Sequence, residues 1–124
     1  MTKVLVVDDD PTVLALIKAK LERDNRFVVI EAHHGKDALD LAENEHPDVI
    51  LCDIDMPNMD GAAVANALER NSATKSIPLV FLSASVTAED MKRGASAGGG
   101  RWQMLSKGSP LNDLIDAIEK STKR

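Results

Sequence analysis

The sequence predicts a doubly wound α/β sandwich, in which a five-stranded parallel sheet carries helices on both faces. Short apolar runs rich in β-branched residues recur along the chain, and such runs are typical of strands buried on both faces. Segments with helical spacing of apolar residues separate them, and this alternation favours right-handed crossovers between parallel strands. The predicted strands are residues 4–7, 27–30, 49–52, 77–82 and 102–106.

A helix is expected after each of these strands. Pro11 suits the first turn of the first helix, and Asp10 or its neighbour is the expected N-cap. Gly35 breaks the chain before the second helix, and His46-Pro47 ends it. The expected helices are residues 11–21, 38–42, 62–70, 87–97 and 110–120.

Length and composition restrict the class of protein. The chain has 124 residues, which is the size of one ordinary domain, with 44% hydrophobic and 28% charged residues. Its net charge of −5 makes it a poor general binder of nucleic acid. Cys52 is the only cysteine, so no intrachain disulfide can form, and we expect it in the core. No apolar run is long enough for a membrane span and the start lacks the layout of a signal peptide, so we expect no membrane partner and a cytoplasmic location.

Polar residues follow the predicted strands at the point where each strand ends. Asp8 and Asp9 follow the first strand, Asp53 the third and Ser83 the fourth, and Lys107 follows the fifth. Because the carboxyl ends of parallel strands meet at one edge of a sheet, we expect these groups to converge. Three close carboxylates repel each other unless a cation or protons intervene, and oxygen ligands suit Mg²⁺.

These groups are complementary for phosphoryl transfer. An Asp carboxylate can act as a nucleophile and form an aspartyl phosphate, while a metal neutralises charge on the phosphoryl oxygens. Lys107 would supply a positive charge and Ser83 a hydrogen bond to that group. The structural alternative is that acids after strands cap helices or form turns, and we favour it for Asp10, Asp48 and Asp60. It explains less well why acids and a lysine end strands one, three and five together.

Four segments match a known family. They are residues 6–10, 47–61, 82–84 and 105–107, and the most specific is the spacing from Asp53 to Met56-Pro57-Asn58-Met59-Asp60-Gly61. With these motifs the chain resembles the receiver domain of two-component response regulators over essentially its full length, as a single domain at residues 1–124. The resemblance implies a flavodoxin-like fold with strand order 2-1-3-4-5.

The resemblance also implies a set of metal ligands and a phosphoryl acceptor. Asp53 would accept the phosphoryl group. Asp8 and Asp9 would hold Mg²⁺, Asp9 most directly, together with Asp53 and the backbone carbonyl of Asp55. The donor would be a phosphohistidine on a sensor histidine kinase or a phosphotransfer protein, and the domain would catalyse its own dephosphorylation with a metal-positioned water.

Further residues would transmit the signal. Ser83 would be the switch hydroxyl, and Lys107 would pair with a phosphoryl oxygen. The aromatic residue of the switch normally lies three residues before the lysine, where this chain has Met104, so either Trp102 replaces it or that arm of the switch is absent. The surface made by helix four, strand five and helix five would contact an unspecified downstream effector.

The chain departs from the family's pattern near Lys107. Gly108 follows it where the family has a cis proline, so we expect a trans bond or an adaptable glycine here. The spacing from the fourth helix to the lysine is longer, and residues 94–101 are glycine-rich, which predicts an irregular segment. His33 and His34 are expected to be solvated loop residues away from the site.

Three other functions remain open. Asp53-Ile54-Asp55 superficially resembles the motif of haloacid-dehalogenase-like phosphohydrolases, although that motif normally follows the first strand and Pro57 stands where Thr or Val is expected. A flavodoxin-like cofactor-binding module would need a hydroxyl- and glycine-rich phosphate loop after strand one, where the acids would repel phosphate. A receiver-like interaction module with a silent site would bind neither Mg²⁺ nor a phosphoryl mimic.

Overall fold

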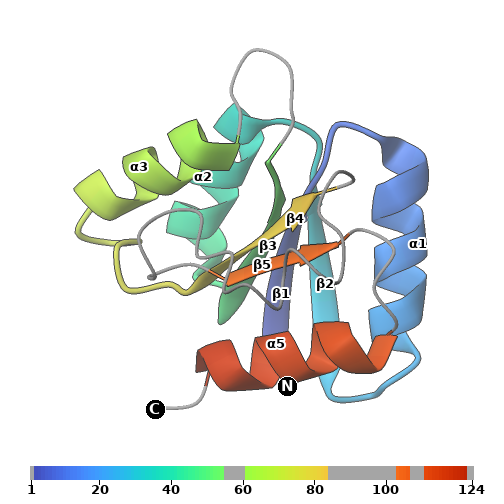
Figure 1. Cartoon of the computed structure of the whole chain (residues 1–124). Helices are drawn as coiled ribbons and strands as arrows, with labels where there is room; N and C mark the ends of the chain where they lie inside the picture. The colour runs from blue at the N-terminus through green and yellow to red at the C-terminus, as the bar shows by residue number, and fades with distance from the viewer. Residues whose placement is uncertain (1, 55–60, 84–102, 107–110, 123–124) are drawn as a thin grey trace.

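A computed structural model of the chain describes residues 2–54, 61–83, 103–106 and 111–122. Within these residues strands alternate with helices from the first strand to the fourth, and a fifth strand and a last helix follow (Figure 1). In chain order the elements are β1 (Thr2–Val7), α1 (Pro11–Glu22), β2 (Phe27–Ala32), α2 (Gly35–Glu45), β3 (Val49–Asp53), α3 (Gly61–Arg70), β4 (Leu79–Ser83), β5 (Gln103–Ser106) and α5 (Leu111–Thr122).

The strands form one parallel sheet in the order β2-β1-β3-β4-β5, which confirms the predicted topology. The first strand lies inside the sheet, between the second and the third. The sheet order therefore reverses direction at β1 and β3, and in such sheets ligands bind beyond the carboxyl ends of the strands at this switch point.

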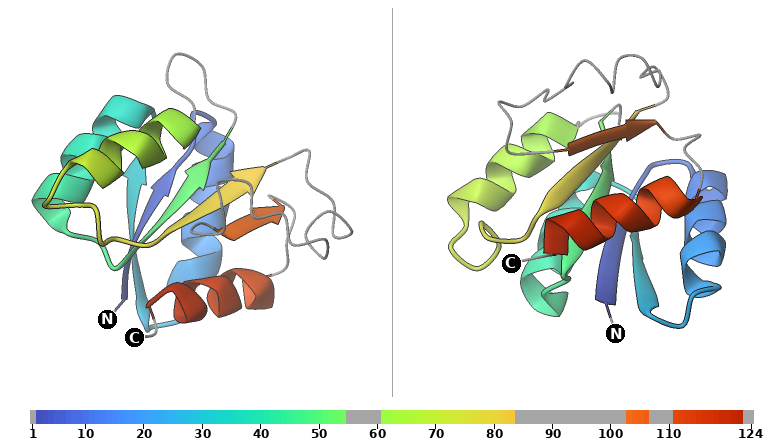
Figure 2. Two further views of the ribbon diagram at one scale, coloured as in Figure 1. Left: turned by 60° about the vertical axis from the view of Figure 1, so that its left-hand side comes forward. Right: turned by 60° about the horizontal axis from the view of Figure 1, so that its bottom comes forward.

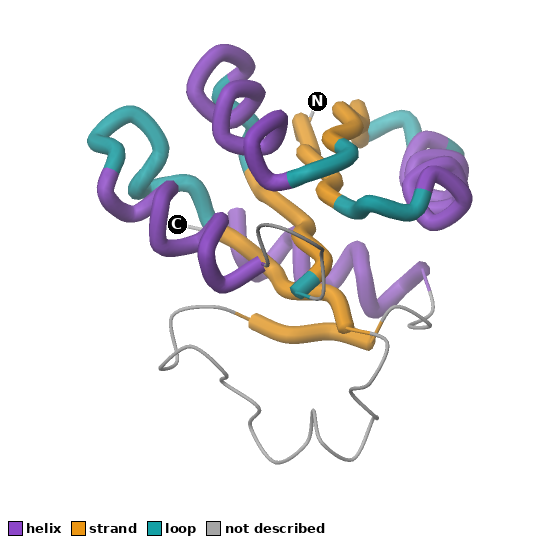
Figure 3. Tube along the Cα trace, turned by 90° about the horizontal axis from the view of Figure 1, so that it is seen from above, coloured by secondary structure: helices purple, strands orange, loops and turns teal. Residues whose placement is uncertain are grey.

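Helices cover both faces of the sheet (Figures 2 and 3). Helices α1 and α5 pack on one face and α2 and α3 on the other, because alternate strand residues point to opposite faces. Leu51 and Leu82 belong to the core under α1 and α5, whereas Cys52 and Phe81 belong to the core under α2 and α3. The burial of Cys52 is as predicted. None of the helices in the described ranges has the length and apolar character that a membrane crossing requires.

The helix ends show which polar residues are structural. Asp10 is the N-cap of α1, as predicted, and its Oδ1 accepts a hydrogen bond from the Thr12 backbone N–H at 2.9 Å. His34 is exposed, as expected, but it also caps α2, since its Nδ1 accepts the Asp37 N–H at 3.4 Å. At the other end of α2, His46 is the C-cap in a left-handed conformation with φ of 49°.

Two predictions at the amino end of the sheet need adjustment. Strand β4 begins at Leu79 rather than at residue 77, because Pro78 has no N–H to pair, although its carbonyl still accepts the Ile50 N–H at 3.0 Å. Asp48 is structural, as predicted, but it ties two strands together: its carboxylate accepts the Lys3 N–H at 2.7 Å and its own N–H donates to the Lys3 carbonyl at 2.8 Å. The helix expected at 87–97 and the irregular segment expected at 94–101 lie outside the described residues.

Candidate functional site

The register of β1 and β3 brings two buried carboxylates together. Val7 and Cys52 are the last paired residues of these strands, and Asp8 and Asp53 are the next residue on each. Their exposed fractions are 0% and 1%. Asp9, which is exposed, completes the group, and one carboxylate oxygen from each of the three residues lies within 4.8 Å of the others.

Hydrogen bonds to the start of α1 orient Asp8. The Asp10 backbone N–H donates to Asp8 Oδ1 at 2.9 Å, and the Asp8 N–H donates to the Ala32 carbonyl at 3.1 Å. Asp10 therefore acts through two groups, since its N–H contacts Asp8 and its side chain caps the helix. The position of Asp8 is thus linked to β2 on one side and to α1 on the other.

Strands β4 and β5 extend the site on its other side. Asp53 is registered with Leu82, so the buried Ser83 lies one residue further along the neighbouring strand. Ser83 is in turn registered with Ser106, the last residue of β5. The backbone of Met104 lies within β5, two positions before that pair.

The remaining predicted site residues are not placed. Lys107 follows Ser106 directly in the chain, but it lies outside the described residues. Asp55 and Trp102 also lie outside them. The structure therefore positions one side of the predicted constellation, namely the three carboxylates and the adjacent serine.

The chain leaves Asp53 and returns to it at Gly61. The Ile54 N–H donates to the Leu82 carbonyl at 3.0 Å, and the Gly61 N–H donates to the Ile54 carbonyl at 3.1 Å. Gly61 is buried at the first position of α3. The close packing of Gly61 was not predicted from the sequence. Its position at the end of the motif that begins with Asp53 could have indicated it.

The carboxylate group fits a small divalent cation. Its donors are all hard oxygens, and Mg²⁺ takes such ligands at about 2.1 Å, so that two ligands on opposite sides lie roughly 4 Å apart. The three carboxylate oxygens lie within 4.8 Å of one another, a range that includes this value. Asp9 lies at the surface, which suits an ion that keeps several water ligands.

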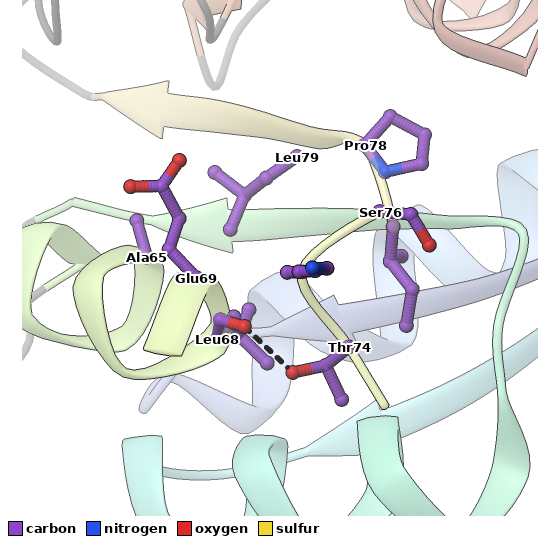
Figure 4. Close-up of a pocket in the computed structure, with 9 residues that line it drawn as sticks. Ala65, Leu68, Glu69, Thr74, Ser76, Pro78 and Leu79 are labelled. Atoms are coloured by element: carbon purple, nitrogen blue, oxygen red, sulfur yellow. Dashed lines mark hydrogen bonds between the residues drawn. The ribbon is translucent and has the colours of Figure 1, made fainter. Parts of the chain in front are cut away.

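A cavity elsewhere in the fold does not coincide with this site. It has a volume of about 140 Å³ and lies between the second half of α3 and the start of β4 (Figure 4). On its wall, the Thr74 hydroxyl donates to the Leu68 carbonyl at 2.8 Å. This is the amino end of β4, whereas the carboxylates lie beyond the carboxyl ends of β1 and β3. Among the residues that the structure describes, the candidate site is defined by its three carboxylates.

A parallel sheet in this order, with acids from β1 and β3 grouped at its carboxyl edge, is the architecture of a receiver. Residues 4–119 match the response regulator receiver domain family, and the chain belongs to this family. Receiver domains are signalling switches rather than classical enzymes, they generally bind Mg²⁺ through an acidic pocket, and they interact with histidine kinases and phosphotransfer proteins.

Individual relatives agree with this assignment. The chain is 34% identical over 122 residues to the nisin biosynthesis regulatory protein NisR of Lactococcus lactis. The aligned residues cover 98% of this chain and 51% of NisR. It is 36% identical over 92 residues to protein PilH of Pseudomonas aeruginosa, covering 74% of this chain and 72% of PilH. A solved response regulator receiver domain from Francisella superposes with a TM-score of 0.79 at 31% identity, covering 100% of this chain and 98% of that one. The chain thus spans about half the length of NisR.

Proposed function

We propose that residues 1–124 form a single receiver domain that acts as a phosphoacceptor switch in a two-component phosphorelay. In this proposal Asp53 accepts a phosphoryl group from a phosphohistidine on a sensor histidine kinase or a phosphotransfer protein. The observation that carries it is the grouping of carboxylate oxygens from Asp8, Asp9 and Asp53 within 4.8 Å at the carboxyl edge of the sheet.

The metal ligands in this proposal are Asp8, Asp9, Asp53 and the backbone carbonyl of Asp55. Bound Mg²⁺ would supply positive charge against the oxygens of the transferring phosphoryl group. The hydrogen bond from the Asp10 N–H holds one oxygen of Asp8 in place. Asp8 therefore needs little reorganisation when it binds a cation.

Transfer then requires a nucleophile and stabilising groups for the phosphoryl oxygens. A carboxylate oxygen of Asp53 attacks phosphorus, an O–P bond forms, and the P–N bond of the phosphohistidine breaks with its electron pair left on the imidazole nitrogen. Ser83, next along the neighbouring strand, donates a hydrogen bond to one phosphoryl oxygen. Lys107 pairs with another.

The same groups transmit and end the signal. Movement of Ser83 towards the phosphoryl group would alter the end of β4 beside β5. The surface formed by the helix expected at 87–97, β5 and α5 would change as a result, with Trp102 or Met104 as the switch residue. In autodephosphorylation a water attacks phosphorus, the O–P bond breaks, and inorganic phosphate leaves with the Asp53 carboxylate restored.

Three findings disfavour the alternatives. Asp53 ends β3, the third strand of the chain, whereas the haloacid-dehalogenase motif is expected after the first strand. The three carboxylates lie close enough to share one cation, which a silent interaction module would not require. Membership of the receiver family also argues against a cofactor-binding module.

The experiment is mass spectrometry of the protein after treatment with acetyl phosphate, with and without Mg²⁺. We expect one phosphoryl group on Asp53 that appears only with the metal and none on the Asp53→Asn variant, which should remain folded. Persistent stoichiometric labelling of that variant would refute Asp53 as acceptor. Sustained turnover of a small phosphate ester would support the hydrolase, and failure to bind Mg²⁺ or a beryllofluoride mimic would support the silent module.

A further inference from the structure

We propose that Gly61 is a positioning residue for Asp53, because only a residue without a side chain lets α3 begin directly against the backbone that carries this carboxylate. The inference rests on the proposed function of Asp53 and adds a residue that contacts neither metal nor phosphoryl group. It concerns the junction where the chain, having left β3, returns to it.

The space around Gly61 is closed by backbone atoms. A Cβ at this position would lie 2.8 Å from the Asp53 carbonyl oxygen, 2.8 Å from the Ile54 Cα and 3.1 Å from the Phe81 ring. Ordinary van der Waals contact begins at 3.4 Å, so any side chain here needs the backbone to move by roughly 0.6 Å. Neither of the two closest neighbours can give way by a change of rotamer.

The surrounding structure directs this movement towards Asp53. Strand β3 is paired with β1 as far as Cys52 and with β4 as far as Asp53, so the pairing on the β1 side ends one residue before this carboxylate. Helix α3 is held by Val64 and Leu68, which are buried in the core shared with α2. The Asp53 carbonyl and the Ile54 Cα, which a Cβ at Gly61 would meet, therefore lie beyond the last residue that β1 pairs, where the contacts with β4 remain.

A shift at this junction would act on the site. Rotation of the peptide group after Asp53 changes the direction of the Asp53 carboxylate relative to Asp8. These two carboxylates share the proposed cation. Asp55, whose carbonyl is a proposed ligand, lies in the segment of chain between Ile54 and Gly61. Because catalysis is sensitive to displacements below 1 Å, a movement of this size should reduce phosphoryl transfer by about tenfold.

The test compares G61A with L68A, a control on the same helix. Leu68 is buried in the core but lies at the far end of α3 from Asp53, so L68A should lower the melting temperature at least as much as G61A. The measurements are the rate of labelling by acetyl phosphate and the Mg²⁺ affinity by calorimetry. We expect G61A to lose about tenfold in both, and L68A to stay within twofold of the native protein.

A second pair of variants separates backbone displacement from core packing. F81L removes the ring that a Cβ at Gly61 would meet and leaves both backbone contacts in place, so G61A/F81L should remain as impaired as G61A while F81L is labelled normally. Recovery of labelling in G61A/F81L would overturn the proposal, because core packing would then be the cause. If G61A is unfolded, the same measurements are made on G61A/F81L. If both variants are unfolded, Gly61 is required for folding and the positioning role is refuted.

The outcomes also distinguish this inference from the proposed function. Native protein that takes no label on Asp53 would overturn the proposed function and the positioning role with it. Native protein that is labelled, together with G61A that keeps the native rate and Mg²⁺ affinity, would overturn the positioning role alone. Equal impairment of L68A and G61A would also overturn it.

Discussion

Asp8 and Asp53 end neighbouring strands at the same level of the sheet, one residue beyond the registered pair Val7 and Cys52, and both are buried. Two carboxylates in this arrangement repel each other, and the removal of their hydration on burial adds to the cost. A bound cation would relieve both effects, so the free energy of unfolding should depend on Mg²⁺.

Magnesium is expected to raise the melting temperature of the native protein. At a concentration of about 100 times its Kd, a ligand that binds only the folded state adds about 2.7 kcal/mol to the free energy of unfolding. Asp8→Asn should lose most of this gain, whereas Asp40→Asn, at an exposed position on α2, should keep it. Thermal unfolding with and without Mg²⁺ measures the effect, and equal gains in both variants would contradict the proposed ligand role of Asp8.

Removal of the α1 cap should destabilise the fold. Asp10→Ala deletes the side-chain acceptor for the Thr12 N–H and should cost about 1 kcal/mol, whereas Asp10→Ser keeps an acceptor and most of the stability. Both variants keep the backbone N–H that orients Asp8, but loss of the cap in the alanine variant should loosen the backbone at this position, so the alanine variant should bind Mg²⁺ more weakly than the serine variant. Chemical denaturation and calorimetry test both points, and an alanine variant as stable as the native protein would be inconsistent with the cap.

Glycine at position 46 should stabilise the protein. His46 is the C-cap of α2 with φ of 49°, a conformation that costs an ordinary residue more than it costs glycine. Part of the gain is offset because glycine has more freedom in the unfolded chain, so we expect roughly 0.5 kcal/mol in favour of His46→Gly. His33→Gly, at an exposed position before α2, is the control and should give no gain in urea denaturation.

Acid should weaken one interaction on the surface. The Arg26 guanidinium, through its side-chain hydrogen bonds, holds the pKa of Asp24 below its ordinary value of 3.8, and the Arg26 backbone N–H contributes further. A lowered carboxyl pKa means that the unfolded state binds the proton first, so the stabilisation is present above 3.8 and is lost as the pH falls through the lower folded value.

The carboxyl resonance of Asp24, followed by NMR against pH, provides the measurement. Its midpoint should lie below 3.8 in the native protein and return towards that value in Arg26→Gln. Added salt should raise the midpoint in the native protein, since Arg26 is exposed and Asp24 is half-buried, so ions from solution can reach the pair. A midpoint that Arg26→Gln leaves unchanged would show that another group causes the shift.

Much of the fold could be predicted because local pattern and tertiary environment agree. The apolar runs that end at Val7 and Cys52 are continuous because these strands are covered on both faces, and their positions were predicted to within a few residues. The N-cap role of Asp10 followed from local chemistry alone. The start of β4 was placed too early because an apolar run does not reveal which N–H groups pair, and Pro78 has none.

Other features depended on contacts between distant segments. The cap formed by His34 was missed because histidine is not a strong N-cap residue and its role follows from backbone geometry. The link between Lys3 and Asp48 joins residues 45 positions apart, which no local pattern indicates. The close packing at Gly61 likewise requires β3, β4 and α3 to be in place together.

By itself, the sequence determined the chemistry available to this protein: acids at the ends of two apolar runs, a serine after a third, and the order of strands and helices. Only the tertiary structure decided that Val7 pairs with Cys52, which buries Asp8 beside Asp53 and leaves Asp9 at the surface. The physical reason is that strand register is set by hydrogen bonds and side-chain packing between segments far apart in the chain, and a shift of one residue would turn every side chain to the opposite face.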